Sequence, residues 1–294
     1  MRIPAMFYPG RTVFSLEVFP PKKGGDIEAL PRTLAGLAEL KPDFISVTYG
    51  AGGNAADLAT AEICAYIKKE LGIEALAHLT CINNTKAEVA AILAQLNARS
   101  IENVLALRGD INPQIEPKRD FANATELTAF IRDHSELSIS GGCYPEGHNE
   151  APDLATDIKH LKEKVEAGAG HLISQLFFDN RLFYDFIDLA RAEGIMAPIE
   201  AGIMPVTNFN QINRLISMCG ASLPRVLGRI LQRYEHDPDG LRAAGIDYAA
   251  AQIEDLISHR VDGIHLYAMN NPAIARSICQ LVPDLGGCLF TPSF

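Results

Sequence analysis

Glu17 is the residue of this sequence with the clearest potential for acid–base chemistry. It lies near the end of the apolar run VFSLEVF and is followed by Pro20 and Pro21, so few backbone donors are close to it. Burial in such a place raises the pKa of a carboxyl, and a carboxyl that keeps its proton near neutral pH can act as a general acid. The alternative is a carboxylate held by an Arg or Lys of a neighbouring strand.

Arg108 and Asp110 form a second candidate, because the apolar run NVLAL ends in RGD. If the extended conformation continues through Gly109, the two charged side chains point the same way, since side chains alternate along a strand. Two interpretations are open: a functional site at the end of a strand, or an ion pair between Arg108 and Asp110 at a loop.

Other polar residues also come late in apolar runs, whereas the early halves of these runs are nearly free of charge. They are Thr48, Tyr49, His78, Thr80, Tyr144, Glu146, His148, Gln175, Asp179 and Asn270. Polar residues in such positions gather at one end of a sheet of parallel strands, where binding sites form.

Three motifs that suggest metal or nucleotide sites are incomplete. Cys143 and His148 in CYPEGH lack a second pair of zinc ligands, and HDPDG at 236–240 lacks the glutamate that completes a calcium loop. GAGGN at 50–54 lacks the order G-x-G-x-x-G, so its glycines indicate a tight turn or a close backbone approach to a ligand. We therefore predict no metal site and no Rossmann-type fold.

The composition indicates one large soluble domain. The chain has 294 residues, of which 48% are hydrophobic and 21% charged, so residues 1–294 can form a single domain around one core. The net charge of −10 and the lack of a long basic block argue against nucleic acid as a partner. No apolar run reaches the ~18 residues of a membrane span. We expect a cytoplasmic protein whose six cysteines are reduced and mostly buried, because none forms a C-x-x-C pair.

Eight short runs rich in Val, Ile, Leu and Phe alternate with longer segments of helical periodicity. The runs span residues 13–19, 44–50, 75–81, 103–109, 138–144, 171–178, 198–204 and 263–269. Strands that alternate with helices are parallel and joined by right-handed crossovers. The pattern therefore predicts an α/β fold, a (β/α)8 TIM barrel, with a doubly wound open sheet as the alternative.

The gap between the seventh and eighth runs is about twice as long as the others. This length predicts an extra helical insertion between strands 7 and 8, around residues 224–234 and 240–259. In a barrel the C-terminal ends of the strands surround the site, so the polar residues named above are expected to converge there.

Eight motifs, in this order along about residues 13–280, resemble the methylenetetrahydrofolate reductase family. They are SLEVFPPK, FISVTYGAGG, AHLTCI, LALRGD, GGCYPEGH, ISQLFFD, GIMPVTNFNQ and HLYAMNN. The resemblance is to the short bacterial type, and it implies a barrel that binds FAD noncovalently without a Rossmann fold. It also implies reduction of 5,10-methylenetetrahydrofolate to 5-methyltetrahydrofolate with NADH or NADPH as electron donor, a step of one-carbon metabolism and methionine biosynthesis.

The resemblance implies roles for residues by their position in these motifs. Glu17 matches the general acid that protonates N10 of the folate, and Asp110 matches an aspartate that favours the resulting iminium cation. The expected flavin contacts are Thr48, Tyr49, His78, Arg108, Gly109, Asp110, Tyr144 and His148. Further contacts are expected at or near Ala122, Ala151, Asp157, His160 and Lys164. Gln175, Gln211 and Asn271 match positions near the folate or the nicotinamide donor.

The chain departs from many bacterial relatives at Asn271, where they have Arg, and at Leu215, where they have an aromatic residue. These positions concern the folate tail and the nicotinamide, so NADH and NADPH both stay open as donors. Two alternatives to this function also stay open: a reductase that takes its electrons from a partner protein, and a flavin- or folate-binding subunit without turnover of its own. A homo-oligomer is expected by analogy with the family.

Overall fold

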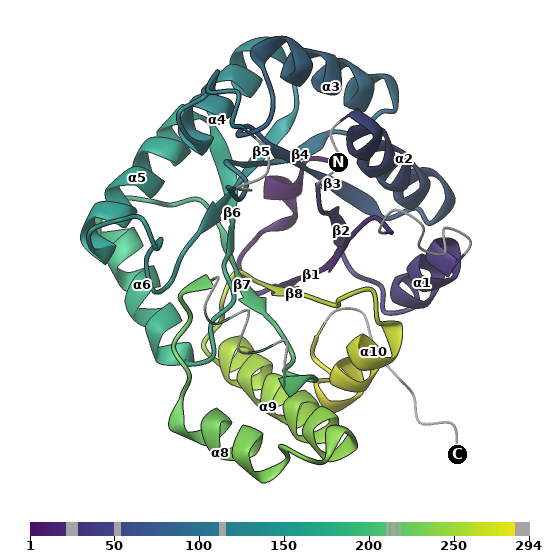
Figure 1. The fold of residues 1–294 in the computed structure, drawn as a ribbon, viewed down its shortest axis with the longest axis vertical. Coiled ribbons are helices and arrows are strands. Elements are labelled where there is room, and N and C mark those ends of the chain that lie inside the picture. The colour runs from purple at the N-terminus through teal and green to yellow at the C-terminus, as the bar shows by residue number, and fades with distance from the viewer. Residues whose placement is uncertain are drawn as a thin grey trace.

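The strands of this chain form one closed parallel barrel, in which β1 to β8 follow each other in chain order (Figure 1). The computed structural model describes residues 1–21, 29–49, 54–111, 116–209, 212, 216 and 219–285. The strands are Val13–Val18 (β1), Phe44–Val47 (β2), Glu74–Thr80 (β3), Asn103–Leu107 (β4), Ser138–Cys143 (β5), Ala169–Ser174 (β6), Ile199–Ile203 (β7) and Gly263–Leu266 (β8). This closure confirms the (β/α)8 barrel and excludes the open sheet.

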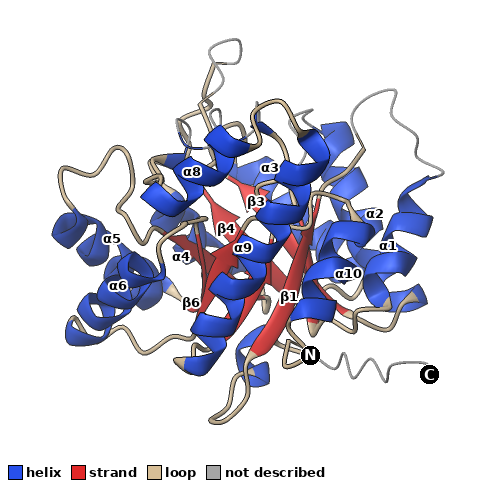
Figure 2. Ribbon diagram, turned by 90° about the horizontal axis from the view of Figure 1, so that it is seen from below, coloured by secondary structure: helices blue, strands red, loops and turns tan. Residues whose placement is uncertain are grey.

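Helices surround the barrel on its outer side, as two views at right angles show (Figures 1 and 2). They are Ala29–Ala38 (α1), Asn54–Glu70 (α2), Lys86–Ala98 (α3), Ala124–His134 (α4), Leu154–Ala167 (α5), Asn180–Ala192 (α6), Arg225–Arg233 (α8), Pro238–Ser258 (α9) and Pro272–Leu281 (α10), and the short 3-10 helix Ile3–Met6 (η1) precedes β1. α8 and α9 lie between β7 and β8, which confirms the helical insertion.

Side-chain caps determine where several of these helices begin. At the start of α3, the Thr85 hydroxyl accepts a hydrogen bond from the Glu88 N–H at 3.2 Å, and the Glu88 carboxylate accepts one from the Thr85 N–H at 2.7 Å. Asp237 accepts a hydrogen bond from the Gly240 N–H at 2.9 Å at the start of α9. The motif HDPDG is therefore a helix cap, and such a cap contributes about 1 kcal/mol to stability.

The strand register determines which side chains enter the barrel. On β1, Ser15 lies opposite Phe44 on one neighbouring strand and opposite His265 on the other. Because side chains alternate along a strand, Ser15 and Glu17 face the interior, and Glu17 is closer to the C-terminal end. The same strand therefore supplies one side chain to the buried interior and one to the open end.

An apolar cluster fills the N-terminal part of the barrel interior. Its buried members are Ile3, Met6, Val13, Phe44, Leu76, Leu105 and Ile173. The first two belong to η1, which closes this end of the barrel. The Ile3 N–H donates to Asn103 Oδ1 at 2.9 Å, and this hydrogen bond fixes η1 to the first residue of β4.

Asn270 joins the last strand to the first strand at the opposite end of the barrel. Its side chain accepts a hydrogen bond from the Phe19 N–H at 3.0 Å and donates one to the Phe19 carbonyl at 2.8 Å. This polar residue, which the sequence places at a strand end, thus has a structural contact.

Four of the cysteines that the structure describes are free and buried, and Cys219 is partly exposed; Cys288 lies outside the described residues. Across the described part of the chain, no helix combines the length and the apolar character that a membrane crossing requires.

Candidate active site

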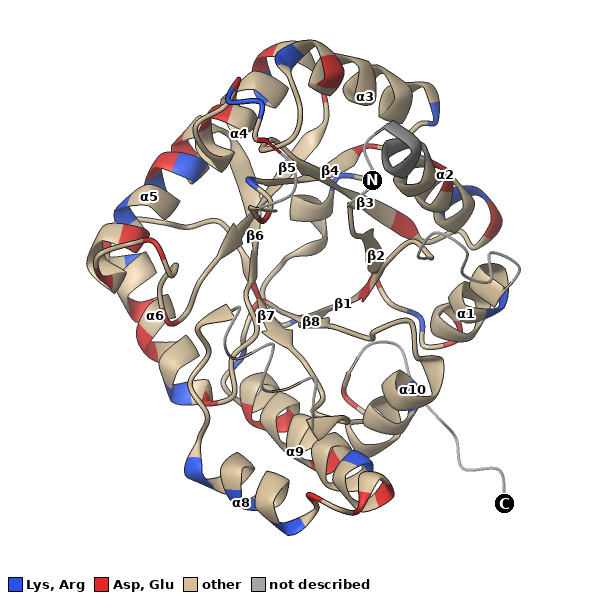
Figure 3. Ribbon diagram, in the orientation of Figure 1, with Lys and Arg blue, Asp and Glu red and all other residues tan. Residues whose placement is uncertain are grey.

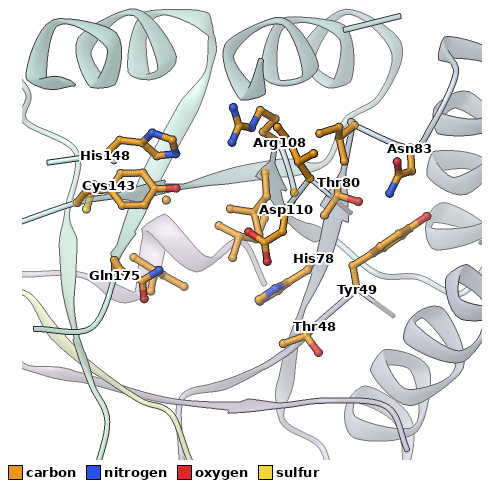
Figure 4. A pocket seen from close by; sticks show the side chains of 18 of the residues that line it. Thr48, Tyr49, His78, Thr80, Asn83, Arg108, Asp110, Cys143, His148 and Gln175 are labelled. Carbon is orange, nitrogen blue, oxygen red and sulfur yellow. The ribbon is translucent and has the colours of Figure 1, made fainter. Parts of the chain in front are cut away.

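A cavity of about 950 Å³ opens at the C-terminal ends of the strands (Figure 4). Ten of the residues predicted above to act in catalysis or to contact the flavin or folate line it, and so do Thr80 and Cys143. The ten are Glu17, Thr48, Tyr49, His78, Arg108, Gly109, Asp110, Tyr144, His148 and Gln175. A cavity of this size lies in the range that holds large cofactors and substrates. The barrel therefore brings together side chains from the ends of six strands, β1 to β6, that are far apart in the sequence.

Glu17 and His78 line the floor of this cavity, and the fully buried His265 lies next to Glu17. Its Oε2 lies 3.6 Å from His78 Nε2 of β3 and 3.7 Å from His265 Nε2 of β8. Burial raises the pKa of the Glu17 carboxyl, but His265 and His78, in their protonated forms, outweigh burial and set this pKa below its ordinary value. The expectation of a raised pKa is therefore wrong for the ligand-free structure, and the neighbouring groups are histidines rather than Arg or Lys.

The two histidines each leave one ring nitrogen without a hydrogen bond. His78 Nε2 and His265 Nε2 are buried atoms that have no partner among the described residues. Burial also lowers the pKa of His78 to about 4, so its ring is neutral near pH 7. A buried polar atom without a partner costs about 1–3 kcal/mol, so both nitrogens indicate a place where a ligand or its protons bind.

Arg108 and Asp110 do not share the direction that an extended strand would give them. β4 ends at Leu107, and Gly109 has a φ of +89°, which turns the chain between the two charged residues. Asp110 points into the cavity toward His78, and the Arg108 side chain points elsewhere (Figure 4). The condition for a shared direction, an extended chain through Gly109, is therefore not met.

Arg108 pairs with Glu150 instead of Asp110. Two hydrogen bonds join them, from Nη1 to Oε2 at 2.5 Å and from Nη2 to Oε1 at 2.9 Å. This bidentate pair raises the pKa of Arg108 and lowers that of Glu150. The guanidinium at the cavity rim is thus occupied by a carboxylate from the loop after β5.

Gly109 also lets the backbone pass close to β3. A Cβ atom at this position would lie 3.0 Å from Thr80 Cβ and 3.1 Å from Ile82 Cγ2. Because φ is positive as well, a side chain at this position would be strained on both counts. The cavity wall beside Asp110 is therefore bare backbone.

Tyr144 and His148 form the wall that follows β5. Their rings meet edge to face, with centroids 4.7 Å apart. The His148 N–H donates to Asp157 Oδ2 at 3.1 Å, so the buried Asp157 holds the loop from behind and does not line the cavity. Burial raises the pKa of Tyr144 to about 12, which keeps its phenol neutral.

Cys143 is buried, and burial raises the pKa of its thiol to about 12. Such a thiol is a poor source of the thiolate that zinc requires. Within the residues that the structure describes, no group of three or more His, Cys, Asp or Glu residues is placed to hold a metal ion.

Other predicted contact residues lie outside the cavity lining. Ala122 donates its N–H to Glu126, Lys164 donates to the Gly142 carbonyl at 2.6 Å, and Asn271 caps α10 by accepting from two backbone N–H groups. Ala151 and His160 do not border the cavity either, and His160 is exposed on α5. Gln211 and Leu215 lie outside the described residues.

Sequence reasoning missed Glu150 and His265 as members of the site. His265 could have been found, because in GIHLYAM it shares a strand face with Tyr267, which lines the cavity. Glu150 carries no such signal, since its contact with Arg108 joins two loops 42 residues apart.

The closed barrel with titratable groups at its C-terminal strand ends defines a (β/α)8-barrel enzyme. The model of the methylenetetrahydrofolate reductase family matches residues 2–283, so this chain belongs to the methylenetetrahydrofolate reductase family.

Relatives from bacteria and plants agree with this assignment. The 5,10-methylenetetrahydrofolate reductase of Pectobacterium carotovorum is 34% identical over 279 residues, covering 94% of this chain and 93% of the relative. The Escherichia coli K12 protein of the same name is 33% identical and covers 92% of this chain and 90% of the relative. Methylenetetrahydrofolate reductase (NADH) 1 of Arabidopsis thaliana is 34% identical, but this chain spans only 49% of its length.

A solved structure shares the fold at low sequence identity. It is an uncharacterized protein from Clostridium thermocellum that binds two copies of 5-methyl-5,6,7,8-tetrahydrofolic acid, with a TM-score of 0.65 and 14% identity. The match covers 92% of this chain and 93% of that one. At this identity the likeness concerns the barrel itself.

Proposed function

We propose that residues 1–294 act as one catalytic domain that reduces 5,10-methylenetetrahydrofolate to 5-methyltetrahydrofolate, with noncovalent FAD as cofactor and NADH or NADPH as electron donor. The observation that carries this proposal is the placement of Glu17 and Asp110 in one cavity of a chain that belongs to this family. A ligand-binding role alone gives no reason for a carboxyl group at the floor between two histidines.

The lining residues fit a flavin dinucleotide. Arg108 offers a guanidinium for a diphosphate once Glu150 releases it, and Gly109 lets the backbone approach a flat ring system. Thr48, Tyr49 and Tyr144 supply hydroxyl groups and aromatic faces, and His78 supplies the unpartnered ring nitrogen. When bound, FAD supplies the transfer of hydride from the nicotinamide to the folate.

Glu17 is proposed to give a proton to N10 of the folate, which opens the five-membered ring and leaves an iminium at N5. In the ligand-free structure its carboxyl has a lowered pKa. A bound pterin ring would cover the 19% of the side chain that is exposed. Removal of water favours the neutral form of a carboxyl, so the acid form is expected in the substrate complex.

Asp110 is proposed to stabilise the iminium cation. Its carboxylate points into the cavity, and within the described part of the chain it pairs with no cation, since Arg108 is turned toward Glu150 (Figure 4). A fixed negative charge beside a developing cation lowers the barrier most where water is excluded. Gln175, on the opposite wall, is proposed to contact the folate.

An anaerobic titration of the purified protein tests the proposed function. The oxidised flavin spectrum is recorded, NADH or NADPH is added first, and methylenetetrahydrofolate is added second. We expect the nucleotide to bleach the flavin and the folate to restore its colour, with one methyltetrahydrofolate formed per flavin.

Each other outcome points to a different function. A flavin that neither nucleotide reduces, but that passes electrons to folate after chemical reduction, indicates an electron-donating partner protein. A flavin that is bleached yet not reoxidised by folate indicates a binding subunit. A protein that binds no flavin contradicts the proposal. The same preparation, run on a sizing column with light scattering, tests the proposed homo-oligomer.

A further inference from the structure

A line of buried polar side chains runs through the barrel interior beneath the cavity. It consists of Ser140, His171, Glu200, Ser15 and His265, each at most 1% exposed, from five different strands. The side chains around it are apolar, and a buried carboxylate in such surroundings is costly unless it is hydrogen-bonded. Charged residues are otherwise found mainly on the outer helices (Figure 3).

Hydrogen bonds connect every member of this line. Glu200 Oε1 accepts a hydrogen bond from the Ser15 hydroxyl at 2.8 Å, and Glu200 Oε2 lies 3.1 Å from His171 Nε2. Ser15 Oγ also lies 2.6 Å from His265 Nδ1. At the far end, Ser140 Oγ lies 2.9 Å from His171 Nδ1.

The direction in which the Ser15 hydroxyl donates its proton determines which ring nitrogen of His265 is protonated. A hydroxyl has one proton, and Ser15 donates it to Glu200, so Ser15 can only accept from His265 Nδ1. His265 therefore carries its proton on Nδ1, and in the neutral ring Nε2 is a bare acceptor. This Nε2 is the atom that lies 3.7 Å from Glu17 Oε2 without a hydrogen-bond partner.

The barrel makes room for Glu200. Gly263 lies beside it in the β7–β8 register, and a Cβ atom on Gly263 would lie 2.7 Å from Glu200 Cγ and 3.0 Å from Oε1. The rings of Phe7 and Phe44 hold His171, with centroids 4.9 and 5.9 Å from its own. The carboxylate is thus packed in one position.

We propose that Glu200 is a positioning residue that, through Ser15, keeps the proton of neutral His265 on Nδ1 and so presents Nε2 as an acceptor to the acid form of Glu17. An acceptor nitrogen stabilises a protonated carboxyl, whereas an N–H group in its place would stabilise the carboxylate. This inference rests on the proposed function only in its effect on catalysis. The groups that face Glu17 and His265 are His78 of β3, Tyr267 after β8 and, through Ser15, Glu200 of β7.

Nitrogen-15 NMR of histidine-labelled protein without flavin or folate tests the inference directly, because it reports the tautomer of each ring. His265→Gln assigns the signals. We expect the Nδ1–H tautomer for neutral His265, and the Nε2–H tautomer in Glu200→Leu, where the Ser15 proton is free to turn to Nδ1. Ser140→Ala is the matched control, since it removes a buried hydroxyl at the far end and is expected to keep the His265 tautomer.

The folate half-reaction supplies the second readout. In Glu200→Leu the N–H on Nε2 favours ionised Glu17. The pH at which the folate half-reaction loses its rate, because Glu17 ionises, is therefore expected to fall by about one unit. Near neutral pH the rate of this half-reaction is expected to be about tenfold lower than in the wild-type protein. Reduction of the flavin by the nucleotide is expected to keep its rate. If Glu200→Leu does not fold, Gly263→Ala displaces the carboxylate and carries the same expectations.

The outcomes separate this inference from the proposed function. The inference is overturned if His265 has the Nε2–H tautomer in the wild-type protein. It is also overturned if replacing Glu200 changes neither this tautomer nor the pH dependence of the folate half-reaction. If the wild-type protein reduces no folate but shows the expected tautomers, the proposed function fails and the positioning by Glu200 stands.

Discussion

The two sides of the cavity are built in opposite ways. On one side Glu17, His78 and His265 are mostly buried, with exposed fractions of 19%, 7% and 0%, and two ring nitrogens have no hydrogen-bond partner among the residues that the structure describes. On the other side Arg108 and Glu150 are 29% and 56% exposed and hold each other in a bidentate ion pair.

This difference shows which groups already have the geometry to meet a ligand and which form an ion pair that must break before a ligand can bind. A buried arrangement is held by packing, so it keeps its geometry without a ligand and suits the reacting atoms. An exposed ion pair is weak because water and salt screen it, so a ligand phosphate can replace one of its members. Substitutions on the first side are therefore expected to change rates, and those on the second side to change affinity.

Glu17→Gln is expected to give the largest effect, and to impair only the chemistry of the buried side of the cavity. The amide cannot supply the proton, so hydride transfer to folate is expected to fall about 100-fold or more. Flavin reduction by the nucleotide is expected to keep its rate, and rapid mixing of the two half-reactions measures both. Normal folate turnover by this variant would remove Glu17 from the mechanism.

His78, on the buried side of the cavity, is expected to make the free energy of unfolding of the protein depend on pH. Its pKa falls to about 4 in the folded chain from the ordinary 6.5, so between these values the unfolded chain binds the proton and the folded chain does not. The contribution of His78 to stability is therefore complete above pH 6.5 and falls as the pH drops toward 4, by at most ~3.5 kcal/mol at ~1.4 kcal/mol per pKa unit.

Urea unfolding of the wild-type protein and of His78→Gln between pH 4 and 7.5 measures this pH-dependent contribution of His78 to the free energy of unfolding. The variant is expected to lose less stability on acidification, while His160→Gln, a change of an exposed histidine on α5, is expected to follow the wild type. Identical curves for the wild type and His78→Gln would show that burial of this ring is not linked to protons.

Arg108→Ala is expected to weaken flavin binding about tenfold, since charge-assisted hydrogen bonds contribute about 1.5–3 kcal/mol. Fluorescence quenching of added FAD measures the affinity. Arg181→Ala is the matched control, because Arg181 is 83% exposed and pairs with Asp179 at the start of α6. Equal effects of the two variants would contradict a contact between Arg108 and the diphosphate.

Glu150→Gln is expected to give the smallest effect, a gain in flavin affinity of a few-fold at low salt. The change frees Arg108 from a pair that is worth about 0.2–1 kcal/mol at such exposure. The gain is expected to vanish at about 0.5 M salt, where screening already loosens the pair. A loss of affinity would mean that Glu150 itself contacts the flavin.

The fold followed from the sequence because its signals are local and repeated. Apolar runs of strand length alternate with amphipathic segments. This alternation predicts a barrel without any knowledge of the contacts between strands and helices that are distant in sequence. The long interval before the last strand likewise predicted the α8 and α9 insertion. Strand ends were less accurate, since the run ending in RGD stops being a strand at Leu107.

The site followed only in part, because its details depend on partners that are distant in sequence. The position of Arg108 and Asp110 at a strand end was predictable, but the turn at Gly109 and the choice of Glu150 as partner were not. Glu200 lies in the apolar run PIEAGIM, whose pattern gives no sign that Ser15 and His171 meet this carboxylate inside the barrel.

The small helix η1 limits where protons of the interior exchange with bulk water. Ile3 and Met6 seal the N-terminal end of the barrel, and the ring of Phe7 stacks on His171. We therefore expect the ring protons of His171 to exchange slowly and mainly by way of the cavity. Deuterium exchange at that ring should slow as soon as a pterin or flavin covers the opening, which makes His171 a natural reporter of occupancy.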